Sequence, residues 1–337
     1  MSELKHLLPP VNRYFKANLH THTTISDGVF SPEETVQMYK ERGYQILALT
    51  DHNVIVNHQN LTTEDFLMLT GVEHDISEPN FTRFKKTYHI NFIAKRPDSL
   101  WQPVAPDDDD LCPPYSDRII VENMEKIYSV EQINKIVAKA NEMGYLVMYN
   151  HPVWSRQNYV DYAGLKGFWA MEICNWGCCA GGWDENNGLI YQDMLMQGNR
   201  IFPVGADDMH NAKSFAGAWI MVGAEKLEYS SVIEALEKGD FYASTGPDIF
   251  ELTLRDGGIV HVRCSDAQCV TVETSSRNAF RCNPTDRTGL LREATFDLRN
   301  WISTCHDMGH HNEFFRITVT GPYGQKAYTR AYWFEEL

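Results

Sequence analysis

Nine side chains that could hold metal ions are spread over the first two-thirds of the chain. Histidine and carboxylate are the usual ligands of divalent zinc, iron and manganese. Nine such groups in one place would hold two or three ions, so we expect a metal-dependent hydrolase. The set comprises six histidines and three carboxylates: His20, His22, Asp27, His52, Glu73, His89, His151, Asp208 and His210.

Most of these residues follow short apolar runs that are typical of β-strands. Side chains alternate along a strand, so His20 and His22 should point the same way and offer one ion two imidazoles. In α/β barrels the active site lies where strands end and the following loops converge. The apolar runs precede five of the candidates: His22 after 15–20, His52 after 45–50, Glu73 after 66–72, His151 after 145–149 and His210 after 201–204.

Strand-like and helix-like segments alternate through the first part of the chain, which favours an α/β fold. Ser31-Pro32-Glu33-Glu34 predicts a helix start, with a serine cap, a proline and acids in the first turn. A second helix is expected over 129–143 and a third over 189–197. A strand that carries His89 is expected over 88–93, and another strand over 168–173.

The pattern changes near residue 246. Short alternating runs at 250–254, 259–263, 269–274 and 314–320 are separated by polar turns, which is typical of an antiparallel sandwich. We therefore predict two domains: a metal-binding α/β domain over 1–245 and a smaller β-rich domain over 246–337. A solvated loop insertion is expected at about 95–122, because five prolines and the run Asp107–Asp110 fall there. That run is either a calcium site or a repelling loop.

The composition limits the kinds of molecule that the protein is expected to bind. The net charge of −15 argues against a long nucleic-acid partner, although metal ions in an acidic protein can still capture a small anion. No apolar run is long enough to cross a bilayer, and residues 1–10 lack a secretory pattern, so we expect a cytoplasmic protein without a membrane partner. The eight cysteines include Cys174, Cys178 and Cys179, which are either thiolate ligands or reduced structural thiols.

Together these motifs resemble the PHP (polymerase and histidinol phosphatase) superfamily. The matching stretches lie within roughly 14–215: Asn18-Leu-His-Thr-His-Thr, Ser26-Asp27-Gly28, Leu49-Thr-Asp-His52, Gly71-Val-Glu73, His89, Asn150-His-Pro152 and Asp208-Met-His210. The β-rich tail is also similar to the carbaryl hydrolase-like branch of metallohydrolases.

The resemblance implies a distorted (β/α)7 barrel with a binuclear or trinuclear centre of manganese, iron or zinc. Many relatives have histidine where Asp27 stands, and an oxygen ligand there favours a harder ion. Asp51 would orient an imidazole, and Asp207 competes with Asp208 as a ligand. By analogy His20, His22, Glu73 and Asp208 hold one ion, Glu73 bridges to a second held by His89 and His151, and Asp27, His52 and His210 hold the third.

The expected reaction is hydrolysis of the phosphate ester of a small metabolite or nucleotide. Two close cations lower the pKa of a bridging water, and the resulting hydroxide attacks phosphorus. Glu73, Asp208 and His210 are the expected catalytic residues. Arg156, His74 and Lys213 are candidate substrate contacts, but a surface arginine and a structural histidine are open alternatives.

Two other functions compete with this one. The same metal centre could hydrolyse a carboxyl ester or carbamate, as the similarity of the tail suggests. An inactive metal-binding scaffold is the third possibility. Trp154 and Trp176 could wall an aromatic leaving group or simply pack, and the sequence leaves the oligomeric state open.

Overall fold

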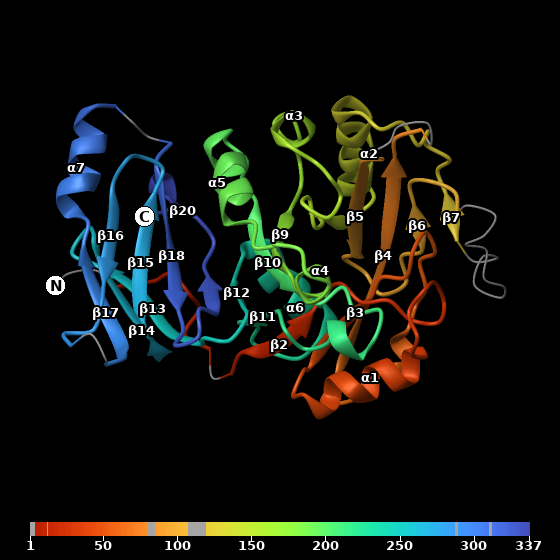
Figure 1. Cartoon of the computed structure of the whole chain (residues 1–337), viewed down its shortest axis with the longest axis horizontal. Coiled ribbons are helices and arrows are strands. Elements are labelled where there is room, and N and C mark those ends of the chain that lie inside the picture. The colour runs from red at the N-terminus through yellow and green to blue at the C-terminus, as the bar shows by residue number, and fades with distance from the viewer. Residues whose placement is uncertain (1–3, 12, 80–84, 107–118, 287–288, 310–311) are drawn as a thin grey trace.

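One large sheet runs through the molecule and carries most of its strands (Figure 1). This computed structural model describes residues 4–11, 13–79, 85–106, 119–286, 289–309 and 312–337. The fold is mixed α/β, as predicted. None of the described helices is both long and apolar enough to cross a bilayer.

The first half of this sheet carries the predicted metal ligands. Parallel pairing joins β2 to β3 and β3 to β4, while β5 is antiparallel to both of its neighbours. The connection from Ser77 to Thr87 is too short for the crossover that parallel neighbours require, so β4 and β5 run in opposite directions. The strand order is β10 (Phe202–Ala206), β9 (Ala170–Asn175), β8 (Tyr145–Tyr149), β5 (Thr87–Ala94), β4 (Leu67–Ser77), β3 (Ile46–Leu49) and β2 (Phe15–Asn18).

The segments that follow β10 and β2 meet each other. The Asp208 amide donates to the His20 carbonyl at 2.9 Å, and the His22 amide donates to the Met209 carbonyl at 3.0 Å. These bonds bring the two ends of the half-sheet together, but β10 and β2 form no continuous ladder. Among the described residues the strands therefore do not close into the expected (β/α)7 barrel.

The predicted helices form, with boundaries close to those expected. Ser31 caps α1 (Pro32–Glu41) by accepting from the Glu34 amide, and the Glu34 carboxylate accepts from the Ser31 amide. Such a capping box satisfies amides that the first turn leaves unpaired. The other helices are α2 (Val130–Glu142), α3 (Tyr159–Tyr162), α4 (Trp176–Ala180), α5 (Gly188–Met196) and α6 (Tyr229–Lys238).

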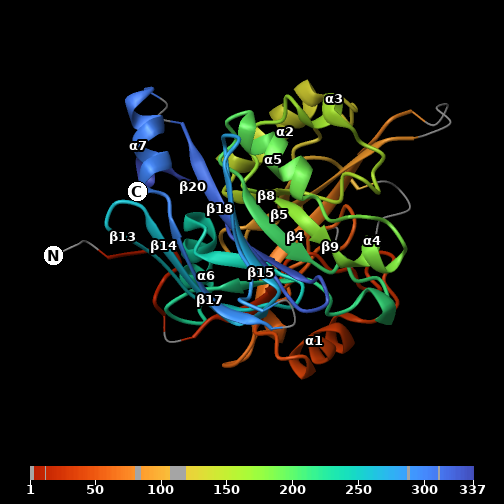
Figure 2. The same ribbon diagram turned by 60° about the vertical axis from the view of Figure 1, so that its left-hand side comes forward.

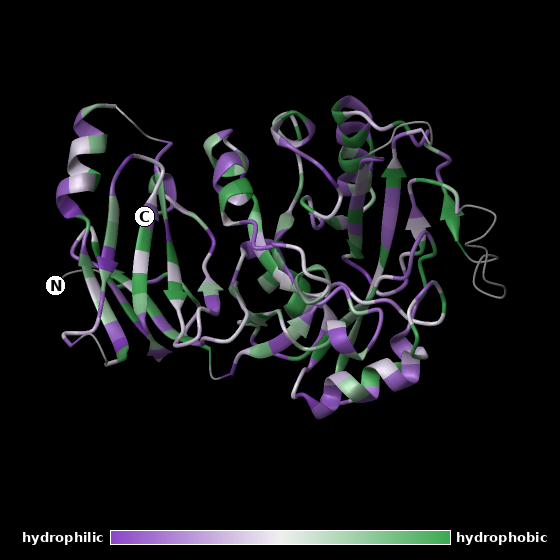
Figure 3. Ribbon diagram, in the orientation of Figure 1, coloured by the Kyte–Doolittle hydropathy of each residue, from purple (hydrophilic) through white to green (hydrophobic). Residues whose placement is uncertain are grey.

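Strand β4 is longer than the apolar pattern predicts. It continues past Val72 to Ser77 because β5 pairs with it over its whole second half. Glu73 therefore lies inside a paired strand and not after its end. Figure 3 shows a hydrophilic stretch within β4, and the sequence Glu73-His74-Asp75 after Val72 explains why hydrophobicity alone ends the strand too early.

Four consecutive residues of the expected solvated insertion at 95–122, residues 101–104, are buried. Trp101, Gln102 and Val104 are buried, with 2%, 0% and 0% exposure, and the two apolar side chains belong to the main core. The short strands β6 (Trp101–Gln102) and β7 (Ile120–Val121) pair in parallel. The Asp107–Asp110 run lies outside the described residues.

The predicted C-terminal strands are confirmed, but they divide between two sheets. Strands β11 (Trp219–Val222), β12 (Phe241–Ser244), β19 (Lys326–Tyr328), β18 (Phe314–Thr320), β15 (Cys269–Thr274) and β16 (Ala279–Cys282) continue the large sheet, and β20 (Tyr332–Trp333) pairs with β18. A separate antiparallel sheet holds β1 (Lys5–His6), β13 (Ile249–Arg255), β14 (Ile259–Ala267) and β17 (Leu291–Asp297).

A second hydrophobic core lies between these two sheets. It contains Val260 and Val262 of the small sheet and Val270 and Ile317 of the large one. Helix α7 (Arg299–Asp307), which the strand pattern does not predict, adds Trp301 to this core. Figure 2 shows α7 and the strands of the small sheet at the same side of the molecule. The domain boundary near residue 246 falls between β12 and β13 and stays a prediction.

Candidate metal centre

The structure brings the nine predicted ligands together at the meeting point of β2, β4, β5, β8 and β10. Within each of four overlapping groups, potential ligand atoms lie within 4.8 Å of one another. These groups draw on segments that are up to 190 residues apart in the sequence. They are His20, His22, Glu73 and Asp208; His22, Asp27, His52 and His210; His52, Glu73 and His89; and His20, His151 and Glu172.

The Glu73 carboxylate is the centre of the cluster. Its Oε1 lies 3.2 Å from His20 Nε2, 3.1 Å from His89 Nδ1 and 3.3 Å from His151 Nε2. Its Oε2 lies 3.3 Å from both His22 Nε2 and His52 Nδ1. One buried carboxylate therefore faces five imidazoles, which suits a group that bridges two cations.

Asp208 faces two of the same imidazoles, those of His20 and His22. Its Oδ1 lies 3.2 Å from His20 Nε2 and 3.1 Å from His22 Nε2. The backbone of Asp208 has φ of 50°, in the left-handed region that side-chain-bearing residues rarely adopt. The hydrogen bond from its amide to the His20 carbonyl helps to hold this conformation, and backbone strain of this kind clusters at functional sites.

Asp27 closes the cluster on its exposed side. Its Oδ2 lies 3.3 Å from His210 Nε2 and 3.8 Å from His52 Nε2. Gly28 follows it, and a Cβ there would lie 2.6 Å from the His22 carbonyl carbon, so only glycine lets this turn pack so closely. The pKa of Asp27 is held well below its usual value: burial opposes this, but the hydrogen bond with His210 and the nearby histidines prevail.

Glu172 supports the cluster and is a residue that the motifs do not reveal. It is fully buried, accepts from His20 Nδ1 at 2.7 Å and accepts from the His151 amide at 2.9 Å. The first bond leaves the lone pair of His20 Nε2 directed at Glu73 and Asp208, as carboxylate partners of metal-bound histidines do. One signal in the sequence could have identified Glu172: it is a carboxylate inside the apolar run 168–173. A buried acid needs hydrogen-bond partners, so such a residue is a candidate for a supporting role.

Glu185 holds the loop after His151. It is buried and accepts from the amides of Val153 and Trp154 at 3.0 and 2.8 Å. His151 itself is fixed by Ser155, whose Oγ lies 3.2 Å from Nδ1. This arrangement turns His151 Nε2 toward Glu73.

Asp51 and Asp207 have structural positions outside the four groups. Asp51 accepts from the amides of Thr23 and Ser26, so it shapes the loop before Asp27. It does not contact an imidazole, contrary to the prediction. Asp207 accepts from three consecutive amides at 216–218, at 2.8, 2.9 and 3.1 Å. Burial raises the pKa of Asp207 to about 6 against these hydrogen bonds. Asp208, and not Asp207, faces the histidines.

Several buried atoms of the cluster have no hydrogen-bond partner. They are His52 Nδ1, Glu73 Oε2, His89 Nδ1 and Asp208 Oδ1. Burying such atoms without a partner costs roughly 1–3 kcal/mol each. Because their nearest neighbours are further nitrogen and oxygen lone pairs at about 3 Å, a shared cation fits the set.

The pKa shifts of two histidines also indicate bound cations. Burial lowers the pKa of His22, but hydrogen bonds with Asp208 and Glu73 outweigh it and raise that pKa to about 10. Burial, with the neighbouring His22 charge, lowers the pKa of His52 to about 4. The cluster thus requires positive charge beside its two buried carboxylates, which divalent ions would provide.

A pocket of about 300 Å³ opens onto the cluster. Beside the ligand side chains, its wall includes Trp154, Trp183, Cys178 and Asn211. No lysine or arginine is among the described residues that line it. Burial raises the pKa of the Cys178 thiol, which therefore stays protonated near neutral pH.

The three predicted substrate contacts do not line this pocket. His74 is fully buried on the other side of β4 from Glu73, with Nδ1 3.0 Å from Asn53 Oδ1, which corrects the substrate role to a structural one. Arg156 lies near the mouth, its guanidinium 4.4 Å from the ring centre of the lining residue Trp183. Lys213 is exposed on a short 3₁₀ turn beyond His210.

The cysteines and Trp176 were further open alternatives. Cys174, Cys178 and Cys179 are free thiols, and none belongs to a described group of potential ligands, so the structure favours the structural role. The Trp176 ring packs against Gly217, where an added Cβ would clash at 2.0 Å. Trp154, and not Trp176, lines the pocket.

Comparison with known proteins agrees with the motif series. Residues 18–186, half of the chain, match the PHP domain family. Over 70 residues, 21% of this chain and 12% of the relative, it is 36% identical to the DNA polymerase/3'-5' exonuclease PolX of Bacillus subtilis. Over 62 residues, 17% of this chain and 23% of the relative, it is 39% identical to a 5'-3' exoribonuclease of Haemophilus influenzae. The chain thus spans less than a quarter of the length of these curated relatives.

Two solved structures were also similar. One is a two-domain protein from Bacteroides vulgatus containing a predicted PHP-like metal-dependent phosphoesterase, with 15% identity and a TM-score of 0.46, covering 97% of this chain and 98% of that one. The other is a putative metal-dependent phosphoesterase from Bifidobacterium adolescentis, with 14% identity and a TM-score of 0.36, covering 58% and 88%. From the match over residues 18–186, the chain belongs to the PHP domain family.

Proposed function

We propose that this protein hydrolyses phosphate ester bonds of a small metabolite or nucleotide with the help of two or three divalent ions, manganese, iron or zinc. One observation carries the proposal: buried nitrogen and oxygen atoms without hydrogen-bond partners converge beside a pocket. A structural role would leave these atoms unsatisfied. Bound cations would satisfy them.

The proposed ligand sets follow the distances. His20, His22, Glu73 and Asp208 would hold the first ion, since their potential ligand atoms form one group. Glu73 would also bind a second ion, which His89 and His151 would hold. Asp27, His52 and His210 would hold a third. His52 is the ambiguous member, because Nδ1 faces Glu73 while Nε2 faces Asp27.

Divalent ions in such a site lower the pKa of bound water and neutralise charge on a phosphate. The protein would fix their positions: Glu172 orients His20, and Ser155 orients His151. We assign Glu73, Asp208 and His210 the catalytic role because all three line the pocket as well as the cluster. A pocket of about 300 Å³ lies at the lower end of the range for small-molecule sites.

The test combines metal analysis with a substrate panel. Protein purified without added ions should contain two to three equivalents of metal, and a His20→Ala/His22→Ala variant should lose most of it. Hydrolysis of p-nitrophenyl phosphate or bis-p-nitrophenyl phosphate should disappear on chelation and return with metal. Metal retention without hydrolysis of any ester in the panel would instead support an inactive scaffold.

Hydrolysis of a carboxyl ester or carbamate is the second candidate. It is favoured by the lack of lysine or arginine among the described lining residues, because a neutral carbonyl substrate needs no cationic clamp. 1-Naphthyl esters test it directly. Selective loss of phosphatase activity in Arg156→Ala would favour the first function, whereas faster turnover of naphthyl esters than of phosphates would favour the second.

A further inference from the structure

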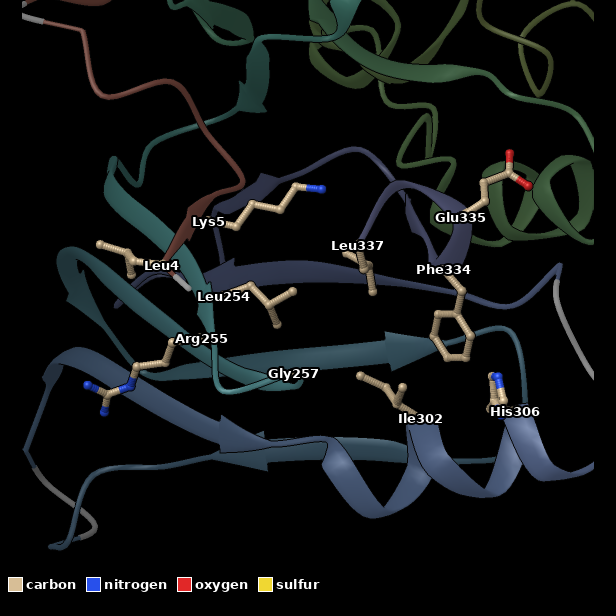
Figure 4. Close-up of a pocket in the computed structure, with 10 residues that line it drawn as sticks. All are labelled: Leu4, Lys5, Leu254, Arg255, Gly257, Ile302, His306, Phe334, Glu335 and Leu337. Atoms are coloured by element: carbon tan, nitrogen blue, oxygen red, sulfur yellow. The ribbon is translucent and has the colours of Figure 1, made fainter. Parts of the chain in front are cut away.

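A second hollow lies away from the histidine cluster, at the open end of the second core. It measures about 670 Å³, compared with about 300 Å³ for the pocket at the cluster. Small-molecule sites typically enclose roughly 300–1,000 Å³, so the hollow is large enough for a ligand. It lies between the edge of the small sheet, α7 and the short 3₁₀ helix at 334–336 (Figure 4).

The floor of this hollow is apolar. Leu254 of β13, Ile302 of α7 and Phe334 and Leu337 of the C-terminal turn point toward a common space in Figure 4. These side chains come from three separate elements that border the second core. An apolar surface of this kind favours an alkyl chain, because each buried methylene contributes roughly 0.8 kcal/mol.

Two cations border the apolar floor. Lys5 and Arg255 line the hollow and are exposed, and neither has an ion-pair partner among the described residues. Figure 4 shows the Lys5 side chain extending over the hollow, whereas the Arg255 side chain points away from the apolar side chains at the opposite end. The carboxylate at the rim, Glu335, is already paired with Arg200 at 2.7 Å. The rim therefore has an excess of positive charge in a chain whose net charge is −15.

We propose that this hollow binds a single-chain amphiphilic anion, an alkyl carboxylate. Its alkyl chain would cover Leu254, Ile302 and Phe334, and its head group would lie beside the ammonium group of Lys5. This site is separate from the proposed metal centre and does not depend on it. It would give the C-terminal β-rich region a ligand of its own.

Calorimetric titration of the whole chain with decanoate tests the proposal. We expect one decanoate per chain and at least tenfold weaker binding of decyltrimethylammonium, which has the same chain and the opposite charge. Lys5→Gln should weaken decanoate binding about fivefold, the upper range for an exposed ion pair, whereas Arg255→Gln should have a smaller effect because that side chain points away from the apolar floor. Lys226→Gln, at an exposed lysine on another surface, should leave it unchanged.

Two further measurements separate this hollow from the metal centre. Ile302→Trp should fill the space and abolish binding, with an unchanged circular dichroism spectrum as the folding control. The His20→Ala/His22→Ala variant should bind decanoate normally. Equal binding of the anion and the cation, or absence of decanoate binding to the parent chain, would overturn the proposal even if Ile302→Trp failed to fold.

Discussion

The histidine pocket and the hollow beside α7 differ in whether the polar atoms of their walls have hydrogen-bond partners. The histidine pocket is surrounded by buried polar atoms, four of which lack hydrogen-bond partners. The hollow beside α7 has an apolar floor, and its polar groups lie at an exposed rim. Removing a ligand from the first would leave lone pairs unsatisfied, whereas water can hydrate the rim of the second.

This difference indicates how tightly each site is built. The histidine cluster is held by Glu172, Glu185 and Asp51, each accepting two or more hydrogen bonds. Such preorganisation has no purpose in packing alone, since buried carboxylates stabilise a fold poorly. The described apolar side chains of the hollow beside α7 have no polar atoms, so they need no such hydrogen bonds. The first region is therefore expected to depend on its ligand much more than the second.

The largest effect is expected from Glu73→Gln. An amide cannot bridge two cations as a carboxylate does, so we expect loss of at least one metal equivalent and about a thousandfold lower kcat/KM, roughly 4 kcal/mol. Metal analysis and steady-state kinetics measure these changes. Glu41→Gln, at an exposed glutamate, is the control. Unchanged metal content in Glu73→Gln would contradict the bridging role.

A comparable change in the second core should affect stability alone. Ile317→Ala removes a fully buried side chain between the two C-terminal sheets and should cost about 3 kcal/mol of unfolding free energy. Metal content and kcat/KM should stay at the parent values, because no predicted ligand touches this core. Denaturant unfolding and metal analysis measure both. Loss of metal in Ile317→Ala would show that the two regions are coupled.

The sequence predicts the histidine region better than its supporting residues. Histidine motifs are recognisable because unusual residue types follow apolar runs, and all nine predicted ligands meet. Glu172 and the extended β4 escape prediction because their roles come from pairing between segments distant in the sequence. The sequence at 101–104 likewise gives no sign of burial, because prolines surround it. The antiparallel direction of β5 depends on the length of the connection from β4 and not on the apolar pattern.

Glu172→Gln should produce a smaller effect than loss of a ligand. The amide can donate to His20 Nδ1 and so reverse the tautomer, which turns a protonated Nε2 toward the cluster. Removing such support typically costs 10–100-fold in metal affinity. We expect about 30-fold weaker metal binding by competition with a chelator, and activity restored by excess metal. Activity that excess metal fails to restore would point to a defect beyond metal binding.

The smallest effects are expected at Arg156, at the mouth of the histidine pocket. Its φ of 61° strains any residue other than glycine, and its guanidinium packs over Trp183. Arg156→Gly should therefore be about 1 kcal/mol more stable than Arg156→Ala, measured by denaturant unfolding. If the guanidinium serves a phosphate substrate, both variants should raise KM about fivefold with kcat nearly unchanged. Equal stabilities of the two variants would contradict the argument from strain. An unchanged KM in both variants would mean that the guanidinium does not bind the substrate, so that the metal ions alone would bind its phosphate, in contrast to the charged rim beside α7.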